Sequence, residues 1–365
     1  MGTSQEIPEG KESEKLAYEP AEHRRKSGVT GRTVKVGRGN FHYLCDGVDI
    51  LKESALAGKR RIWLRALLVM VALGAGCGLW SSAWVMIYPG DTLRTLQKWS
   101  IDAALGSPEF VETPVGSLAV WRGGPPSITT TVFVHGFGDA GAGWTQVATA
   151  LAHDRSVVVL DLPGHGRSAP QTGPLSFELL LTGLDSLLES IEGPIVLVGN
   201  SLGGWLAATW SLEHPERIQR LVLVNNAGFR TPLAVGELLP DTREGMRRKN
   251  EAVLGANAPS LPGFLLDGLL EIHADPRLHA LFEHLMTQAP HLDEGPIHYS
   301  GAVQLVWGTP DPFFPEEGYL PRVQAAFPQA TTERLDGCAH APQYSCPDQL
   351  AAVLAKTSEG AAATE

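Results

Sequence analysis

Most of the chain after residue 110 alternates between strand-like and helix-like hydrophobic patterns. The predicted strands are residues 115–121, 129–134, 157–160, 195–198, 221–224, 303–307 and 332–335. Apolar positions recur with helical spacing over residues 177–191 and 202–214. Most of these strands are continuous apolar runs, as expected for strands that are covered on both faces. The alternation therefore predicts an α/β fold with a mostly parallel, doubly wound sheet between helices.

A stretch of about 70 residues interrupts this pattern between residues 226 and 299. We expect a helical cap over residues 229–299, inserted into a catalytic domain of residues 110–357. Asp275 and Pro276 are typical of a helix start. An apolar stripe follows at Leu278, Leu281, Phe282 and Leu285. The stripe predicts an amphipathic helix that packs against the other helix of the cap. In the alternative interpretation it lines an acyl pocket, with substrate-binding candidates Phe264, Leu265, Leu269, Leu281 and Phe282.

Residues 66–88 form an apolar segment of 23 residues without a charged side chain. About 20 apolar residues span the hydrocarbon core of a bilayer, so the segment is predicted to be one transmembrane helix. Trp80, Trp84 and Tyr88 are typical of a membrane interface. The same region resembles a bacterial lipoprotein signal with lipidation at Cys77, although Gly74 stands where that signal has leucine. Either interpretation tethers the protein to a membrane.

Basic residues are concentrated before this segment. Five of them precede it closely and two follow it within a similar distance: Lys52, Lys59, Arg60, Arg61 and Arg65 before, Arg94 and Lys98 after. The positive-inside rule therefore predicts a cytoplasmic N-terminus and a catalytic domain on the opposite side of the membrane. The polar residues 1–61 are expected to be largely disordered, and residues 358–365 form a flexible tail.

Charge and cysteine spacing exclude several functions. The first 88 residues carry 13 Lys+Arg and 9 Asp+Glu, whereas the rest carries 16 and 31, a net charge of −15. A catalytic part with this negative charge is not expected to bind nucleic acid. The cysteines, at positions 45, 77, 338 and 346, lack zinc-site spacing, so neither a metal nor a cofactor is predicted. Cys338 and Cys346 are interpreted as unrelated thiols, with a disulfide as the alternative in an oxidising compartment.

The predicted strand at residues 195–198 leads directly into Gly199-Asn200-Ser201-Leu202-Gly203 and then into a helical stretch. A G-x-S-x-G sequence between a strand and a helix is the turn that exposes a nucleophilic serine. The glycines are needed because side chains at these positions would collide with neighbouring backbone. We therefore predict Ser201 to be a nucleophile.

A nucleophilic serine needs a base and an orienting acid, which follow in the order Asp, His in this type of fold. Asp311 comes just after the predicted strand at 303–307, and His340 comes just after the strand at 332–335. We predict that His340 accepts the Ser201 proton while Asp311 orients the imidazole. Glu316 and Glu317 are competing candidates for the acid.

The strand at residues 129–134 ends in His135-Gly136-Phe137-Gly138. Charge that develops on a carbonyl oxygen needs preplaced donors, and the backbone N–H groups of Phe137 and Leu202 are the expected oxyanion hole. His135 is interpreted as a support of this turn. His165 and Arg167 are interpreted as supports of the turn that follows the next strand.

Five motifs occur in order and at ordinary spacings: HGFG, DLPGHGRS, GNSLGG, WGTPDPFFP and CAHAP. On these motifs, residues 110–357 resemble the α/β-hydrolase family, which implies that fold with a cap inserted in it. The anchor, followed by Tyr88-Pro89-Gly90, resembles the membrane-tethered monoacylglycerol-lipase branch. Ala339 stands where the family has glycine before its histidine. Ser201 stands where the epoxide hydrolases and haloalkane dehalogenases of this fold have aspartate.

These features favour a membrane-tethered serine hydrolase that cleaves carboxylic esters through an acyl-enzyme. Monoacylglycerols or other medium-chain, lipid-like esters are the expected substrates. A C–C bond hydrolase with the same triad is the alternative, because a fold does not fix the substrate. A cofactor-free haloperoxidase and a non-catalytic binding protein are the remaining alternative functions.

Overall fold

The computed structural model describes residues 87–256 and 258–356, all within one compact unit that covers Cys77–Glu365. The polar segment at residues 1–61, the tail at 358–365 and all but the last two residues of the predicted membrane segment lie outside these ranges. Within them, none of the helices combines the length and the hydropathy that crossing a bilayer requires.

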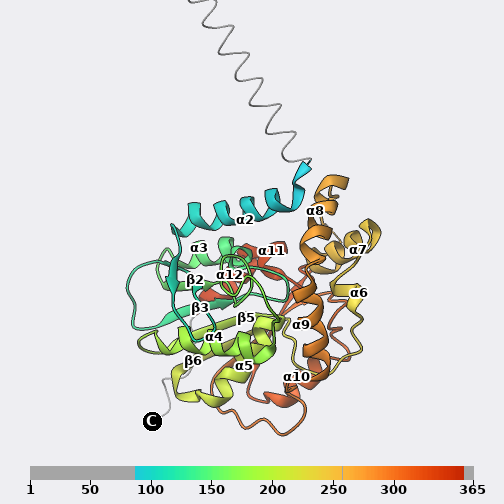
Figure 1. Ribbon diagram of the computed structural model, residues 1–365. Helices are drawn as coiled ribbons and strands as arrows, with labels where there is room; N and C mark the ends of the chain where they lie inside the picture. The colour runs from blue at the N-terminus through green and yellow to red at the C-terminus, as the bar shows by residue number, and fades with distance from the viewer. Residues whose placement is uncertain (1–86, 257, 357–365) are drawn as a thin grey trace, which may run out of the picture. The chain divides into compact units, whose positions relative to one another are not determined.

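An eight-stranded sheet forms the centre of this unit (Figure 1), in the order β1-β2-β4-β3-β5-β6-β7-β8. The strands are β1 (Glu109–Val111), β2 (Leu118–Gly123), β3 (Thr130–Val134), β4 (Ser156–Leu160), β5 (Ile195–Asn200), β6 (Ile218–Val224), β7 (Val303–Thr309) and β8 (Thr331–Asp336). Strands β3 to β8 run parallel, while β1 and β2 extend one edge in antiparallel pairing. The predicted mostly parallel sheet is confirmed.

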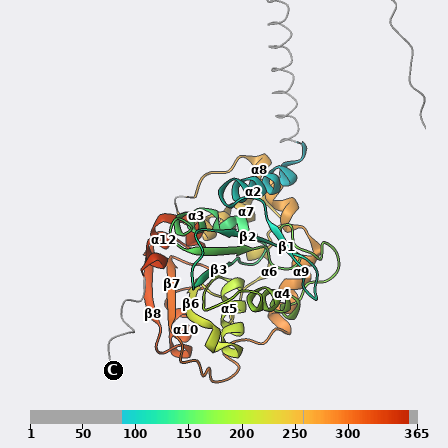
Figure 2. The same ribbon diagram turned by 90° about the vertical axis from the view of Figure 1, so that its left-hand side faces the viewer.

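Helices cover both faces of the sheet (Figures 1 and 2). One layer contains η1 (Gly141–Trp144), α3 (Thr145–Leu151), α11 (Pro342–Ser345) and α12 (Pro347–Ala355), and the other contains α4 (Phe177–Glu189), α5 (Leu202–Glu213), η2 (Pro215–Arg217) and α10 (Leu320–Ala326). Alternate side chains of β3 pack into the two helical layers. Phe133 packs with α3 and α12, and Val132 and Val134 pack with α4 and α5. Double coverage explains the continuous apolar runs in the sequence.

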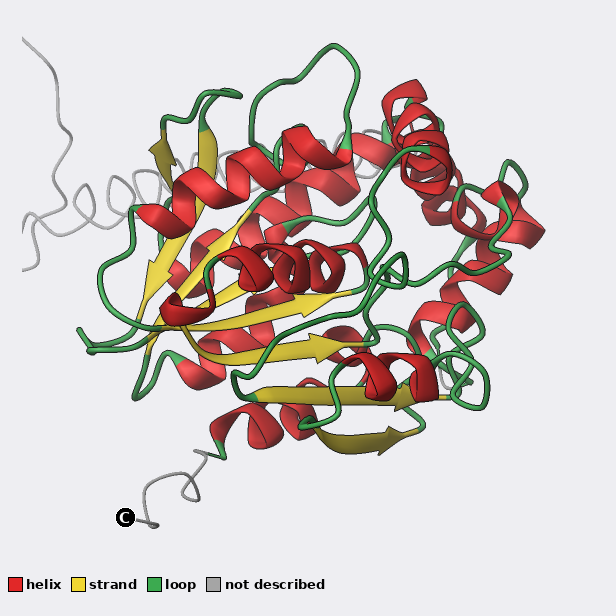
Figure 3. Ribbon diagram, turned by 90° about the horizontal axis from the view of Figure 1, so that it is seen from below, coloured by secondary structure: helices red, strands yellow, loops and turns green. Residues whose placement is uncertain are grey.

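The order of the strands decides where a site can form. β3 lies between β4 and β5. After β3 the chain forms the neighbouring strand β4, and it then returns past β3 to form β5 on the opposite side of that strand. Ligands of such sheets bind in the crevice beyond the carboxyl ends of the strands, where the strand order reverses. In this chain, the turns after β3 and β5 meet at that point. Figure 3 shows the loops at this end of the sheet, with the sheet seen from below.

Within the residues that the structure describes, the cap predicted between β6 and β7 contains four helices. They are α6 (Val235–Leu238), α7 (Arg243–Leu254), α8 (Gly263–His273) and α9 (Pro276–Thr287). The Asp275 side chain accepts a hydrogen bond from Arg277 N (2.9 Å), and Pro276 is the first residue of α9. The predicted helix and its start are therefore confirmed.

The apolar stripe of α9 divides between the cap and the main core. Leu278, Leu281, Phe282 and Leu285 are all buried. Leu281 and Leu285 belong to the large core cluster beside α4, and Phe282 packs with Phe137. The expectation that the stripe packs within the cap is confirmed in part: Leu278 and Phe282 cluster with Leu238 of α6 and with Leu239, whereas the other two stripe residues face the main core.

A helix that the sequence patterns did not predict, α2 (Pro89–Leu105), links the cap to the core. At its start, Gly90 N donates to the Glu271 carboxylate of α8 (3.1 Å). A Cβ atom on Gly268 of α8 would lie 2.7 Å from the carbonyl carbon of Pro89, so only glycine allows this approach. At its other end, Asp102 accepts from Trp121 Nε1 (3.0 Å) and forms an ion pair with Arg167 (2.7 Å).

Candidate active site

Ser201 lies in the turn between β5 and α5 with a φ of 55°, in the left-handed region. The turn fits because Gly203 lies directly against β3: a Cβ atom there would lie 2.3 Å from the Val134 carbonyl oxygen. Ser201 N donates to Val224 O of β6 (3.1 Å). The structure thus has the strained strand–turn–helix geometry that the sequence predicts around Ser201.

His340 and Asp311 form a buried pair. Asp311 Oδ2 accepts from His340 Nδ1 (2.8 Å), and the Asp311 side chain has no exposed surface. Asp311 Oδ1 accepts from the N–H groups of Phe313 (2.9 Å) and Phe314 (3.1 Å). These bonds fix the carboxylate, and they leave His340 Nε2 as the ring nitrogen that can accept a proton.

The competing acids lie elsewhere. Glu316 forms an ion pair with Arg334, and Glu317 is exposed to solvent. Of the three acidic candidates, Asp311 is the one that contacts His340.

Ser201 and His340 line the same cavity of about 260 Å³, which we call the catalytic cavity. Within the described ranges, the Ser201 hydroxyl makes no hydrogen bond. Catalytic hydrogen bonds are often long in the absence of substrate and tighten when it binds. The structure therefore brings the three predicted triad residues to one place, with the Asp–His contact already formed.

The two predicted oxyanion donors lie on either side of the nucleophile turn. Phe137 follows β3 and lines the catalytic cavity, and Leu202 is the first residue of α5. Neither backbone N–H has an acceptor in the part of the chain that the structure describes. For Leu202 this is expected, because the first N–H groups of a helix have no partner inside it.

His135 holds the turn that carries Phe137, as predicted. Its Nδ1 donates to Gly136 O (2.9 Å) and its Nε2 accepts from Leu162 N (2.9 Å). Burial lowers the pKa of His135 to about 4, so the ring is neutral. Arg167 has a second role that its sequence position did not reveal, because its guanidinium binds Asp102 of α2.

Three amide side chains that the sequence patterns did not single out support the triad. Asn200 Nδ2 donates to the His340 carbonyl oxygen (3.0 Å), and Gln343 Nε2 donates to Asn200 Oδ1 (2.9 Å). Asn225 Nδ2 donates to Asp311 Oδ2 (2.8 Å). Asn225 follows a predicted strand directly and Asn200 follows another after one glycine, and this position at the carboxyl ends of β5 and β6 is the signal that could have identified them.

A disulfide joins Cys338 to Cys346, with 5.5 Å between their Cα atoms. The interpretation of the two cysteines as unrelated thiols is therefore wrong. The chain turns sharply at Ala339, whose φ is 51°, and the short helix α11 then returns it toward Cys338. His340 lies inside the closed loop.

The candidate substrate-binding residues of the cap lie in different environments. Leu269 lines the catalytic cavity, and Phe282 lines a smaller cavity of about 40 Å³ that also reaches Ser201. Leu281 is fully buried in the core. Phe264 and Leu265, half-buried on α8, line neither of these two cavities.

A lysine from the cap lies in the wall of the catalytic cavity and was missed by sequence reasoning. Lys249 of α7 donates to Leu238 O (2.6 Å) and to His273 Nε2 (2.5 Å). His273 Nδ1 in turn donates to Leu269 O (2.7 Å). Desolvation lowers the pKa of Lys249 to about 7 and that of His273 to about 3. The cavity therefore has a lysine ammonium in its wall in addition to the imidazoles of His273 and His340.

The sequence profile of the alpha/beta hydrolase family matches residues 131–353. An uncharacterized protein of Mycobacterium tuberculosis (strain ATCC 25618 / H37Rv) is 28% identical over 244 residues, 59% of this chain and 71% of that protein. The (lyso)-N-acylphosphatidylethanolamine lipase of Bos taurus is 37% identical over 106 residues, 28% of this chain and 31% of that enzyme. The crystal structure of a membrane phospholipase A has a similar fold, with a TM-score of 0.63 and 24% identity over 80% of this chain and 96% of that one.

Proposed function

Because this chain belongs to the alpha/beta hydrolase family, we propose that it hydrolyses carboxylic esters through an acyl-enzyme on Ser201. The observation that carries the proposal is the buried hydrogen bond between His340 Nδ1 and Asp311 Oδ2 (2.8 Å), in the wall of the cavity that contains Ser201. The free N–H groups of Phe137 and Leu202 on either side of Ser201 support it.

In the proposed reaction, Ser201 Oγ attacks the ester carbonyl carbon and its proton passes to His340 Nε2. The N–H groups of Phe137 and Leu202 stabilise the negative charge on the carbonyl oxygen. His340 then donates its proton to the leaving alkoxide, and the alcohol departs. Water, deprotonated by His340, hydrolyses the acyl-enzyme and releases the acid and the serine hydroxyl. Asp311 stabilises the protonated imidazole in both steps.

We further propose that the acyl group is of medium length and lipid-like. The side chains of Leu238, Met246, Val253, Leu254, Leu269 and Phe313 give the catalytic cavity its apolar walls. The bovine relative is named a lipase and the structural neighbour a phospholipase A, so both of those proteins are named for the hydrolysis of lipids. The monoacylglycerol-lipase branch remains our proposal on the sequence resemblance.

The proposed site of action is a membrane surface. Residues 66–88 are the proposed transmembrane helix, with lipidation at Cys77 as the alternative anchor. The charge distribution around the segment supports a cytoplasmic N-terminus, with the catalytic domain on the opposite side.

Labelling with a fluorophosphonate tests the nucleophile, because the serine oxygen displaces fluoride and stays covalently attached. We expect the full-length protein in detergent to be labelled and to cleave nitrophenyl and glyceryl esters. Ser201→Ala should lose both properties. Ser186→Ala is the matched control, because Ser186 lies on α4, donates from its hydroxyl to Thr182 O (2.9 Å) and lines neither cavity that reaches Ser201.

Labelling that persists in Ser201→Ala would overturn the assignment of the nucleophile. Labelled protein that cleaves a vinylogous diketone but no ester would favour the C–C bond hydrolase instead.

A further inference from the structure

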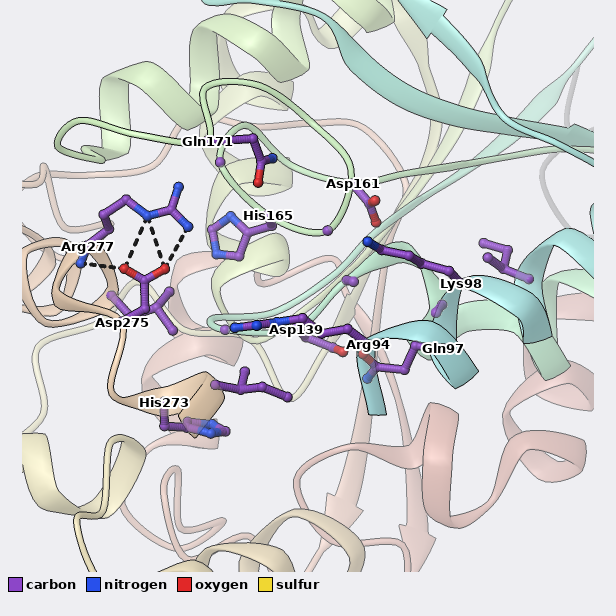
Figure 4. A pocket seen from close by; sticks show the side chains of 18 of the residues that line it. Arg94, Gln97, Lys98, Asp139, Asp161, His165, Gln171, His273, Asp275 and Arg277 are labelled. Atoms are coloured by element: carbon purple, nitrogen blue, oxygen red, sulfur yellow. Dashed lines mark hydrogen bonds and ion pairs between the residues drawn. The ribbon is translucent and has the colours of Figure 1, made fainter. Parts of the chain in front are cut away.

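A second cavity of about 330 Å³, which we call the polar cavity, shares part of its lining with the catalytic cavity. Figure 4 shows side chains that line the polar cavity. Both cavities are lined by Gln97, Gly138, Asp139, Leu269 and His273. Most of the remaining wall of the polar cavity comes from α2, from the turn after β4 and from the start of α9, and β2, α8 and the segment after β3 complete it. A substrate that is held at Ser201 therefore has a second compartment next to it.

The charges around the polar cavity are balanced. Three cationic and three acidic side chains line it: Arg94, Lys98, Arg277, Asp139, Asp161 and Asp275. Arg277 and Asp275 neutralise each other in an ion pair of 2.6 Å. Asp161 accepts from two backbone N–H groups, and Asp139 accepts from Tyr344 Oη (2.6 Å). With no excess of either sign, the cavity suits a neutral polar group better than a phosphate or an ammonium group.

Several polar groups of this cavity have spare hydrogen-bonding capacity. Within the described residues, the Gln97 side-chain amide and the Lys98 ammonium have no hydrogen-bond or ion-pair partner. His165 Nδ1 donates to Pro163 O (3.0 Å), which leaves its Nε2 as an acceptor, and this buried nitrogen also has no partner. Hydroxyl groups both donate and accept, so they match a wall of mixed donors and acceptors.

We propose that the polar cavity binds the hydroxylated alcohol portion of the ester that is cleaved at Ser201, such as a glyceryl group. This inference rests on the proposed ester hydrolysis. The acyl chain occupies the catalytic cavity, which has the more apolar walls of the two. Gln97 and Asp139, which line both cavities, contact the alcohol at the junction. Gln97 is thus a specificity-determining residue, supplied by a helix that begins directly after the predicted anchor.

Two esters with the same acyl chain test this proposal: 1-glyceryl octanoate and methyl octanoate. The readout is the ratio of their kcat/KM values for the full-length protein in detergent. We expect the wild-type protein to prefer the glyceryl ester. Gln97→Leu should lower the ratio about fivefold, mainly through KM, as expected for one lost hydrogen bond. Gln146→Leu is the matched control, because Gln146 lies exposed on α3 and lines neither cavity.

A second variant acts by volume rather than by hydrogen bonding. Ala140 is half-buried in the wall of the polar cavity, and Ala140→Leu should lower the ratio by filling that space. An unchanged ratio in both Gln97→Leu and Ala140→Leu, or equal cleavage of the two esters by the wild-type protein, would overturn the inference while leaving ester hydrolysis intact. If the wild-type protein cleaves neither ester, the proposed function itself is wrong.

Discussion

The catalytic turns and the walls of the two cavities are built in different ways. Ser201 and His340 each follow a strand of the sheet, within a short local motif. The cavity walls instead combine Gln97 of α2, Lys249 of α7 and Leu269 of α8, which lie far apart in the sequence. The chemistry of the proposed reaction is therefore encoded locally, whereas the choice of ester depends on tertiary packing between the cap and α2. Substitutions in the turns should stop the reaction, and substitutions in the walls should change which esters react.

After the loss of activity in Ser201→Ala, the next largest effect is expected at the orienting acid. Asp311→Asn keeps the size of the side chain but cannot hold His340 in the same tautomer, so kcat should fall about 10³- to 10⁴-fold with little change in KM. Steady-state kinetics on a nitrophenyl ester measures this. Glu316→Gln is the control, because Glu316 pairs with Arg334 at the surface, and its kcat should stay within about twofold of wild type. The reverse result would move the acid to Glu316.

A smaller effect is expected from the disulfide beside His340. The bridge spans a sequence separation of eight residues, so Cys346→Ser should lower the free energy of unfolding by about 2–3 kcal/mol. Activity should also fall, because His340 lies inside the loop that the bridge closes. Urea denaturation and ester kinetics measure the two effects, and wild-type protein in a reducing agent should behave like the variant. A wild-type protein that is indifferent to reduction would contradict this role.

The smallest effect is expected in the wall of the catalytic cavity. Leu269→Ala removes apolar contact with the acyl chain, and each lost CH₂ contact is worth about 0.8 kcal/mol, or roughly fourfold. The rise of kcat/KM from acetate to octanoate esters should therefore become shallower, while acetate cleavage changes little. Leu270→Ala is the matched control, because Leu270 is half-buried on the same helix but does not line the catalytic cavity. Equal chain-length profiles for all three proteins would exclude Leu269 from acyl binding.

The strands and the catalytic turns could be predicted because their signals are local. Buried parallel strands produce apolar runs, and the tight approach of Gly203 to β3 requires the glycine that the motif contains. The helix α9 could be predicted for the same reason, from Asp275, Pro276 and the stripe that follows. The packing partner of that stripe could not, because an amphipathic pattern shows which face is buried but not what covers it.

Features that depend on contacts between distant parts of the sequence could not be predicted from the sequence patterns. The disulfide depends on the left-handed turn at Ala339 and on α11, neither of which has a strong sequence signal. The helix α2 lacks a regular apolar stripe, and few of its side chains are buried. Its position depends on Gly268 and Glu271, which come about 180 residues later.

The double attachment of α2 limits how the cap can move. The start of α2 is held to α8 by Gly90, and its end is held to the core by Asp102. α8 therefore cannot swing outward as a hinged lid unless the Gly90–Glu271 bond breaks or α2 is pulled from Trp121 and Arg167. We therefore expect substrate to enter while α2 and α8 stay together, through rearrangement of side chains between the helices. The width of that opening, rather than the frequency of cap opening, is then expected to limit the size of the molecules that reach Ser201.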